Sequence, residues 1–239
     1  MKIKFQIDKK YDKGMIISML SGSDWEYRAN KMGLDMNLAE RIHKANGKLP
    51  QTTRVEINKL VDEAYDKFLP YMEISLSLYS ESWNQIIKEF SNIISNKYYG
   101  WYFDNYICNI THFHSGISNW GGNIVARWWK ENHFTQRRIT AHEILLAHYF
   151  SIHRNKYSNE GLNDKQIWAL AEIFAFAVTG LDPDIKKFWP WDNTGYYINH
   201  NYLELVKIQN KMKSPFLEMN NLNDYIEEGI RQVKISGIK

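Results

Sequence analysis

Two strongly apolar segments that carry charged residues constrain the fold of this chain more than any other feature. Residues 140–148 read TAHEILLAH, and residues 169–176 read ALAEIFAF. Glu172 is the only charged residue between positions 167 and 181, in a segment that is apolar on nearly every side of a helix. Such a helix is predicted to lie in the interior, where a carboxylate must be paired, protonated or bound to a metal.

The bulk composition is that of a folded protein with a sizeable core. The chain has 239 residues, of which 44% are hydrophobic and 15% aromatic. This length suits one domain, or one domain with a helical extension, and the apolar content argues against disorder. The formal net charge is only +3, and basic residues are scattered among nearly as many acids. We therefore expect no nucleic-acid partner.

The cysteine content and the N-terminal sequence predict a cytoplasmic protein. Cys108 is the single cysteine, which rules out a disulfide within the chain. The apolar run at residues 15–20 is too short and too interrupted for a signal peptide or a membrane span. We expect no membrane partner, and the sequence does not predict the oligomeric state.

The spacing of apolar residues predicts helices over most of the chain. A short strand is expected within residues 1–8, where apolar and polar residues alternate. Asp35 is expected to cap a first helix and Thr53 to start the next, and after a break at Pro70 a further helix begins at Met72. Further helices are expected at residues 136–156, 163–179 and 221–233, with a shorter one after residue 199.

Residues 98–129 have a different pattern. Their β-prone runs are broken by glycines, and we interpret them as two or three antiparallel strands. The predicted fold is α+β: a helix-dominated domain with a small antiparallel sheet and an N-terminal helical region. The N-terminal strand and helical region would span residues 1–97. The domain with the candidate site would span residues 98–239, unless the two form one continuous domain.

The candidate site begins with His142 and Glu143. A metal-dependent hydrolase on one helix commonly uses His-Glu-x-x-His, because residues four apart share a helix face. Here the fourth position is Leu146, and the next histidine is His148, six residues after His142. On a regular helix these two histidines are about 120° apart around the axis and about 9 Å apart along it. His148 can be a second ligand only if the helix bulges or breaks.

An aromatic, turn-rich stretch farther along the chain supplies further candidates. Tyr196, Tyr197 and His200 lie in residues 189–200, WPWDNTGYYINH. One of these side chains could donate a hydrogen bond to an oxyanion. His200 could instead be the ligand that Leu146 does not provide.

With these residues, the chain resembles the zincin metallopeptidases, particularly the gluzincin branch. The resemblance covers residues 121–200 and rests on a strand at 123–129, the His142-Glu143 pair and Glu172 about 30 residues later. It implies a zinc-dependent hydrolase of peptides or proteins. His142, Glu172 and either His148 or His200 would bind Zn²⁺, and Glu143 would be the general base for a metal-activated water. The strand would hold the peptide by edge pairing, and Tyr196, Tyr197 or His200 would stabilise the transition state.

Other interpretations use the same residues. His142 and Glu143 could be polar residues on an exposed helix turn, and Glu172 could form a buried ion pair with Arg127, Arg137 or Arg138. Leu146 could mark a non-catalytic zincin-like protein that serves as a protein-binding module. A third possibility is an enzyme whose histidine and glutamate side chains act by acid–base chemistry without a metal.

Overall fold

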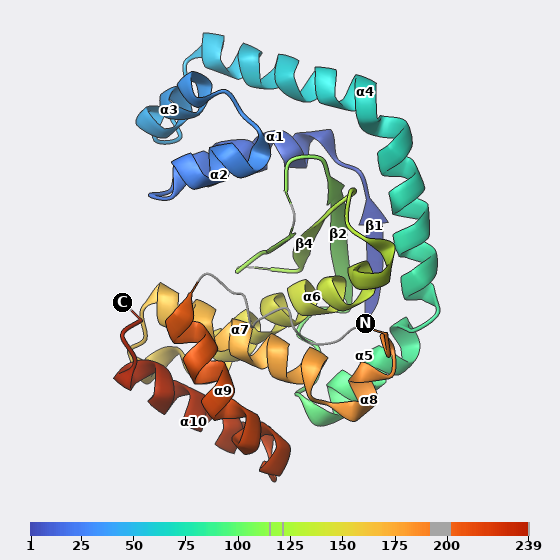
Figure 1. The fold of residues 1–239 in the computed structure, drawn as a ribbon, viewed down its shortest axis with the longest axis vertical. Helices are drawn as coiled ribbons and strands as arrows, with labels where there is room; N and C mark the ends of the chain where they lie inside the picture. The colour runs from blue at the N-terminus through green and yellow to red at the C-terminus, as the bar shows by residue number, and fades with distance from the viewer. Residues whose placement is uncertain (115, 121, 192–201, 239) are drawn as a thin grey trace.

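A small sheet and the helices around it make up the described part of the chain (Figure 1). The computed structural model describes residues 1–114, 116–120, 122–191 and 202–238. The strands are β1 (Lys2–Gln6), β2 (Asn105–Thr111), β3 (Gly116–Ser118) and β4 (Ile124–Trp128). The helices are α1 (Lys9–Leu20), α2 (Trp25–Met32), α3 (Met36–Ala45), α4 (Gln51–Asn84), α5 (Ile87–Lys97), α6 (His133–Lys156), the 3₁₀ turn η1 (Ser158–Glu160), α7 (Asp164–Gly180), α8 (Pro183–Lys186), α9 (Leu203–Glu218) and α10 (Leu222–Ile235).

The sheet is not antiparallel as the sequence suggested. Its strand order is β1-β2-β4-β3, and both the β1–β2 and β2–β4 pairs are parallel, with Cys108 of β2 opposite Val125 of β4. Only the three-residue β3 is antiparallel, to β4. The dominance of helices is confirmed, whereas the prediction of a small antiparallel sheet was wrong.

Two properties of the sequence explain the parallel pairing. Residues 112–123 separate β2 from β4, and a connection of about a dozen residues is long enough to return the chain to the start of a parallel neighbour. The strands are also buried over continuous runs, in β2 from Cys108 to the end of the strand and in β4 at its three central positions. Continuous burial is typical of parallel sheets covered on both faces.

Helix α4 runs unbroken through Pro70, where we expected a break between two helices. Proline removes one backbone hydrogen bond from a helix, so it usually kinks or ends it. In this chain the helix bends in that region and continues along the sheet (Figure 1). Tyr65 and Met72, on either side of Pro70, are both buried, and their packing keeps the two halves in one helix.

The helix starts are set by polar caps. The side chain of Asp35 accepts a hydrogen bond from the Leu38 amide and caps α3, as predicted. Asn163 and Gln166 form a capping box at the start of α7. Helices α6, α7 and α10 agree with the predicted positions to within a few residues. Helix α9 begins soon after residue 199, as predicted, but it is not the shorter helix that we expected, because it has 16 residues.

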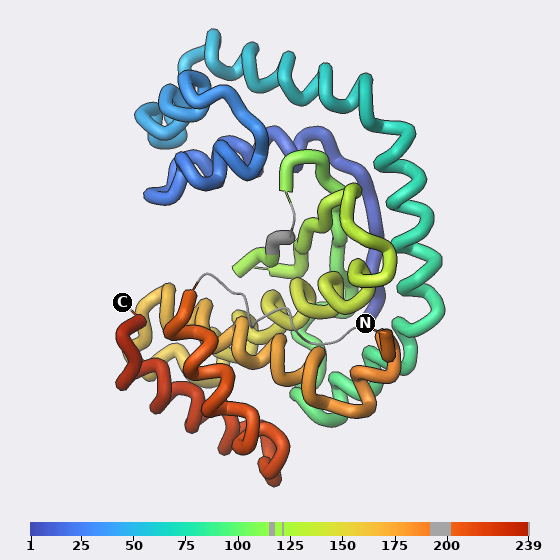
Figure 2. The backbone as a smooth tube through the Cα atoms, viewed as in Figure 1, coloured from blue at the N-terminus to red at the C-terminus, as the bar shows by residue number. Residues whose placement is uncertain are grey.

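Buried side chains form two hydrophobic clusters. The main cluster lies around the sheet, α6 and α7, and Cys108 is fully buried in it. The N-terminal cluster joins α1, α2, α3 and the first half of α4. Residues 1–97 also contribute to the main cluster, because β1 belongs to the sheet and the last turns of α4 and α5 pack there. Figure 2 shows α1–α3 at one end of the sheet and α8–α10 at the other.

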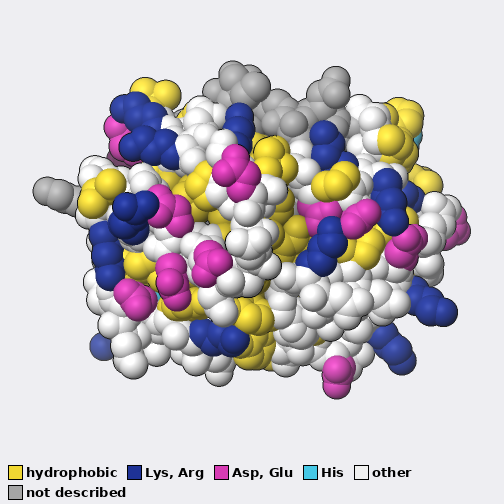
Figure 3. Space-filling view, turned by 90° about the horizontal axis from the view of Figure 1, so that it is seen from below, with side chains coloured by type: hydrophobic (Ala, Val, Ile, Leu, Met, Phe, Trp, Pro, Cys, Tyr) yellow, Lys and Arg dark blue, Asp and Glu magenta, His cyan; other side chains and the backbone are white. Residues whose placement is uncertain are grey.

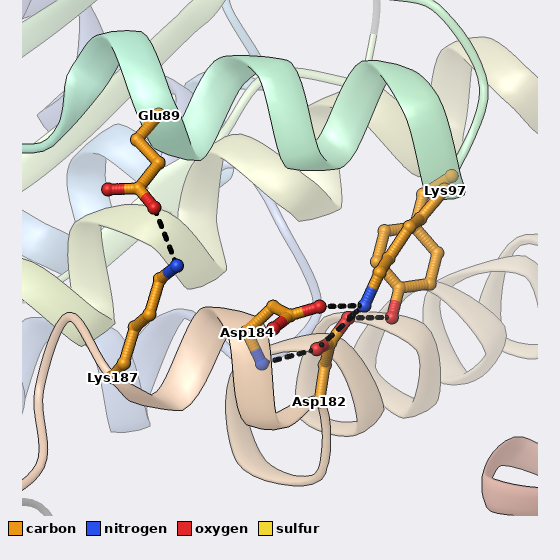
Figure 4. Close-up of polar contacts among 6 residues, drawn as sticks. Glu89, Lys97, Asp182, Asp184 and Lys187 are labelled. Carbon is orange, nitrogen blue, oxygen red and sulfur yellow. Dashed lines mark hydrogen bonds and ion pairs between the residues drawn. The ribbon is translucent and has the colours of Figure 1, made fainter.

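An ion-pair cluster joins α5 to α8 (Figure 4). Asp182, the N-cap of α8, is buried and accepts hydrogen bonds from Lys97 Nζ at 3.1 and 3.2 Å and from the Tyr98 hydroxyl. Lys97 also contacts Asp184 at 2.6 Å. A second, exposed pair joins Glu89 to Lys187.

The surface seen in Figure 3 has interspersed acidic and basic side chains, with neither sign predominating. This pattern agrees with the small net charge of the chain. Within the residues that the structure describes, no helix combines the length and the apolar character that crossing a membrane requires.

Candidate functional site

Helix α6 carries most of the candidate site. Asn132 caps it by accepting a hydrogen bond from the Phe134 amide, just after the strand β4 and a short turn. The helix is α-helical over its whole length and is buried at every position from 138 to 153. It packs against α7 on one side and against β3 and β4 on another, so its polar side chains face other elements rather than solvent.

The structure brings together two of the predicted metal ligands. His142 Nε2 lies 3.2 Å from Glu172 Oε2, across the interface between α6 and α7. Both residues are buried, with exposed fractions of 2% and 8%. The neighbouring residues Ala141 and Ala171 are fully buried as well. The packing of α6 against α7 therefore holds the pair in place. The sequence predicts an interior position for both residues, because each lies in a strongly apolar segment.

Glu143 lies beside this pair and faces the strand β4. Its Oε1 is 3.9 Å from Nη1 of Arg127, whose side chain is almost completely buried. Nη2 of the same guanidinium is 2.6 Å from Glu131 Oε2, in the turn that leads to α6. Arg127 thus contacts two carboxylates, one on each side. A buried guanidinium needs such partners, because an uncompensated charge in the interior is costly.

The electrostatics of Glu143 suit proton transfer near neutral pH. Burial raises the pKa of Glu143 to about 6, while His142 and Arg127 oppose the rise and the carboxylates of Glu172 and Glu131 add to it. A carboxylate with a pKa in this range is ionised at neutral pH and is a stronger base than an exposed glutamate.

Helix α4 fixes the turn between β4 and α6. The Tyr79 hydroxyl donates to the carbonyl oxygens of Trp128 at 3.0 Å and Glu131 at 3.2 Å. Ser75 donates to the carbonyl oxygen of Trp129 at 2.7 Å. These bonds hold the backbone from which Glu131 reaches Arg127, so the C-terminal half of α4 supports the site without entering it.

His148 lies apart from the His142–Glu172 pair. Its Nε2 is 3.2 Å from the carbonyl oxygen of Tyr98, and its ring packs against Trp101 with the ring centroids 4.7 Å apart. Because α6 has no bulge, the six-residue spacing directs this imidazole to another side of the helix, as its geometry predicted. Burial lowers the pKa of His148 to about 4.

The predicted roles of Tyr196, Tyr197 and His200 fall on residues 192–201, which lie outside the described part of the chain. The described residues fit a metal in part. His142 and Glu172 are a nitrogen and an oxygen donor of the kind that zinc accepts. Catalytic zinc sites use three protein ligands, and within the described ranges no three His, Cys, Asp or Glu side chains are grouped to hold a metal.

Two features of the site were not predicted. Strand β4 lies between β2 and β3, so it is not the free edge that peptide pairing would require. The contacts of Arg127 with Glu131 and Glu143 are the second feature; the sequence suggests Arg127 only as one of three partners for Glu172. The signal in the sequence was a single arginine inside the apolar run of residues 124–128.

Comparison with known proteins adds no relative: no family, no curated protein and no solved structure matches this chain.

Proposed function

We propose that the interface of α6 and α7 is the catalytic centre of a zinc-dependent hydrolase that acts on peptides or proteins. The observation that carries the proposal is the contact of 3.2 Å between His142 Nε2 and Glu172 Oε2, with Glu143 next to it on the same helix. Together these residues supply two ligands of the kind zinc prefers and one carboxylate that is not used as a ligand.

Each residue has a distinct role in this proposal. His142 and Glu172 hold the metal, and the third ligand stays a prediction, with His200 the candidate because His148 is bonded to Tyr98. A zinc ion supplies Lewis acidity toward a substrate carbonyl and toward water. Glu143 accepts the proton of the attacking water and returns it to the leaving group, which its pKa of about 6 allows at neutral pH.

A second candidate function is acid–base catalysis without a metal. The described residues favour it in one respect, because a histidine in contact with a buried carboxylate is the arrangement that orients an imidazole as a general base. In this case Glu172 would orient the imidazole of His142, and the protonated fraction of Glu143, whose pKa is about 6, would be the acid.

Metal content and hydrolysis of an unstructured protein such as casein, measured on untagged protein, test the proposal. We expect about one zinc per chain in the wild type and a loss of zinc in His142→Gln and Glu172→Gln, because each removes one ligand. His153→Gln is the matched control: it is another buried histidine of α6, 11 residues from His142, and should retain the metal. His148→Gln should also retain it.

Activity then separates the alternatives. Glu143→Gln should keep its zinc and lose hydrolysis by about 10²- to 10⁴-fold. A folded His142→Gln protein that still carries one zinc would refute the metal site. Hydrolysis that is insensitive to chelator but lost in Glu143→Gln would favour acid–base catalysis. Neither metal nor hydrolysis in the wild type would leave the non-catalytic, protein-binding alternative.

A further inference from the structure

The outward face of α4 is apolar where solvent contact predicts polar residues. Tyr71, Ile74 and Leu78 have exposed fractions of 57%, 60% and 50%. Ile74 is nine residues before Trp83, which is buried with 1% exposed, and nine residues turn a helix through about 900°, which is half a turn beyond two full ones. Ile74 therefore lies on the side of α4 that faces directly away from the protein.

This face forms a continuous stripe. Pro70, Ile74 and Leu78 follow one another at four-residue spacing, and Tyr71 lies beside them. We call these four residues the α4 stripe. The ring of Tyr71 stacks on that of Trp129, with the centroids 6.0 Å apart, and this contact fixes the position of the exposed tyrosine. An amphipathic surface helix normally keeps such a line polar, and a grouped apolar patch of this kind commonly marks an interface.

We propose that the α4 stripe binds the α4 stripe of a second copy of this chain, with the two helices antiparallel and a two-fold axis at Ile74. In such an isologous contact, a residue a given number of positions before Ile74 faces the residue the same number after it in the partner. Ile74 then packs on the partner's Ile74, and Pro70 faces the partner's Leu78.

The sequence on either side of Ile74 is complementary under this symmetry. Lys67, seven residues before Ile74, faces the partner's Glu81, seven residues after it, and the two-fold axis makes this contact twice. Tyr71 faces the partner's Ser77, so the largest side chain of the stripe meets a small one. Lys67, Ser77 and Glu81 are all exposed. A parallel arrangement would place Lys67 on Lys67 and Glu81 on Glu81, which is unfavourable.

The size of the contact predicts a weak dimer. From Lys67 to Glu81 the helix spans about 21 Å, at 1.5 Å per residue. The bend of α4 near Pro70 turns the first half of the helix toward α1–α3, so the contact ends within about one turn before Pro70, at Lys67 (Figure 1). One pair of helices of this length buries less than about 1,200 Å², which is the range of transient interfaces.

Sedimentation velocity over about 1 to 300 μM, a range that covers weak interfaces, tests this proposal. We expect the wild type to dimerise with rising concentration and Ile74→Glu to raise the dissociation constant at least about tenfold, because it places two charges at the apolar centre of the contact. Val55→Glu is the matched control, since Val55 is 54% exposed on the other half of α4 and should leave the dimer intact.

Charge exchange tests the antiparallel register. Lys67→Glu alone and Glu81→Lys alone should each weaken the dimer, and the double variant should restore it, because the two signs are then only swapped. A wild type that stays monomeric at the highest concentration would overturn the proposal. So would a dimer that Ile74→Glu does not weaken, or a double variant that is as weak as the single ones. Binding of the monomer to anionic vesicles, lost in Ile74→Glu, would assign the stripe to a membrane surface instead.

Discussion

Buried charges around α6 determine what the individual residues of the site can do. Glu143 lies near Arg127, and burial raises its pKa, while the charges of His142 and Arg127 oppose that rise and the carboxylates of Glu172 and Glu131 add to it. His142 and Glu172 contact each other across two helices that are apolar around them. Because these side chains are buried, each of these interactions is stronger than it would be at the surface, and the loss of one partner affects the others.

His148 gives a test of burial at the residue scale. Its pKa is about 4 in the folded state and about 6.5 in the unfolded chain. Between these values the unfolded state binds the proton and the native state does not, so the stability that is present above pH 6.5 is lost as the pH falls toward 4. We expect His148 to contribute about 3 kcal/mol to that loss.

The measurement is urea unfolding at pH 7 and pH 4 for the wild type and for His148→Gln. Glutamine retains a donor for the carbonyl oxygen of Tyr98 and cannot titrate. The variant should lose less stability between the two pH values than the wild type. His133→Gln, at the exposed start of the same helix, should behave like the wild type. Equal pH dependence in the wild type and His148→Gln would contradict the prediction.

Residue patterns predicted part of the site. The proximity of His142 and Glu172 could be anticipated, because each lies in an apolar stretch of a helix, and two such stretches are expected to pack in one core. The six-residue spacing also predicted the separation of His148 from His142 on a regular helix. The contact of Arg127 with Glu143 could not be predicted, since it depends on how β4 is placed against α6, and that placement results from contacts distant in sequence.

At the scale of elements, the contacts between α5 and α8 allow a buried ion pair to be compared with an exposed one (Figure 4). Asp182 belongs to the buried pair and Lys187 to the exposed one. Asp182→Ala removes an N-cap and leaves the buried Tyr98 hydroxyl without its acceptor. We expect a loss of about 2 to 4 kcal/mol in the free energy of unfolding. Lys187→Ala removes an exposed pair and should cost less than about 1 kcal/mol. Urea unfolding followed by far-UV circular dichroism measures both, and equal losses would show that burial does not control these pairs.

Helices were easier to predict than strand direction for a physical reason. A helix closes its hydrogen bonds within one segment, so periodicity and caps such as Asp35 locate it. A strand finds its partners elsewhere, and neither the parallel pairing of β2 with β4 nor that of β1 with β2 is encoded within one segment. The break that we predicted at Pro70 was wrong because the local sequence does not show tertiary packing. Packing on both sides of Pro70 outweighs the one backbone hydrogen bond that the proline removes.

At the scale of the whole molecule, α4 couples the two hydrophobic clusters. Its first half places Ile57 and Val61 in the N-terminal cluster, and its second half places Tyr79 and Trp83 in the main cluster. Trp129 packs against both. A helix shared in this way should make the two clusters unfold together, although they have separate interiors.

Hydrogen exchange followed by mass spectrometry tests this coupling. Ile42→Ala in the N-terminal cluster and Ile144→Ala in the main cluster each remove a fully buried side chain, at a cost of about 2 to 5 kcal/mol. We expect either variant to lower protection in both clusters. Protection lost only in residues 9–68 of Ile42→Ala would show instead that the N-terminal cluster unfolds on its own.

The parallel pairing of β1 with β2 also has a consequence for how the chain is made. Gln6 of β1 is bonded to Asn109 of β2, 103 residues later. A ribosome that adds about 5 to 20 residues per second needs about 5 to 20 s to cover that distance. During this time β1 has no partner, whereas α1, α2 and α3 can already pack on one another. The earliest strand of the sheet to be synthesised must therefore wait for a hydrogen-bonding neighbour from the middle of the chain.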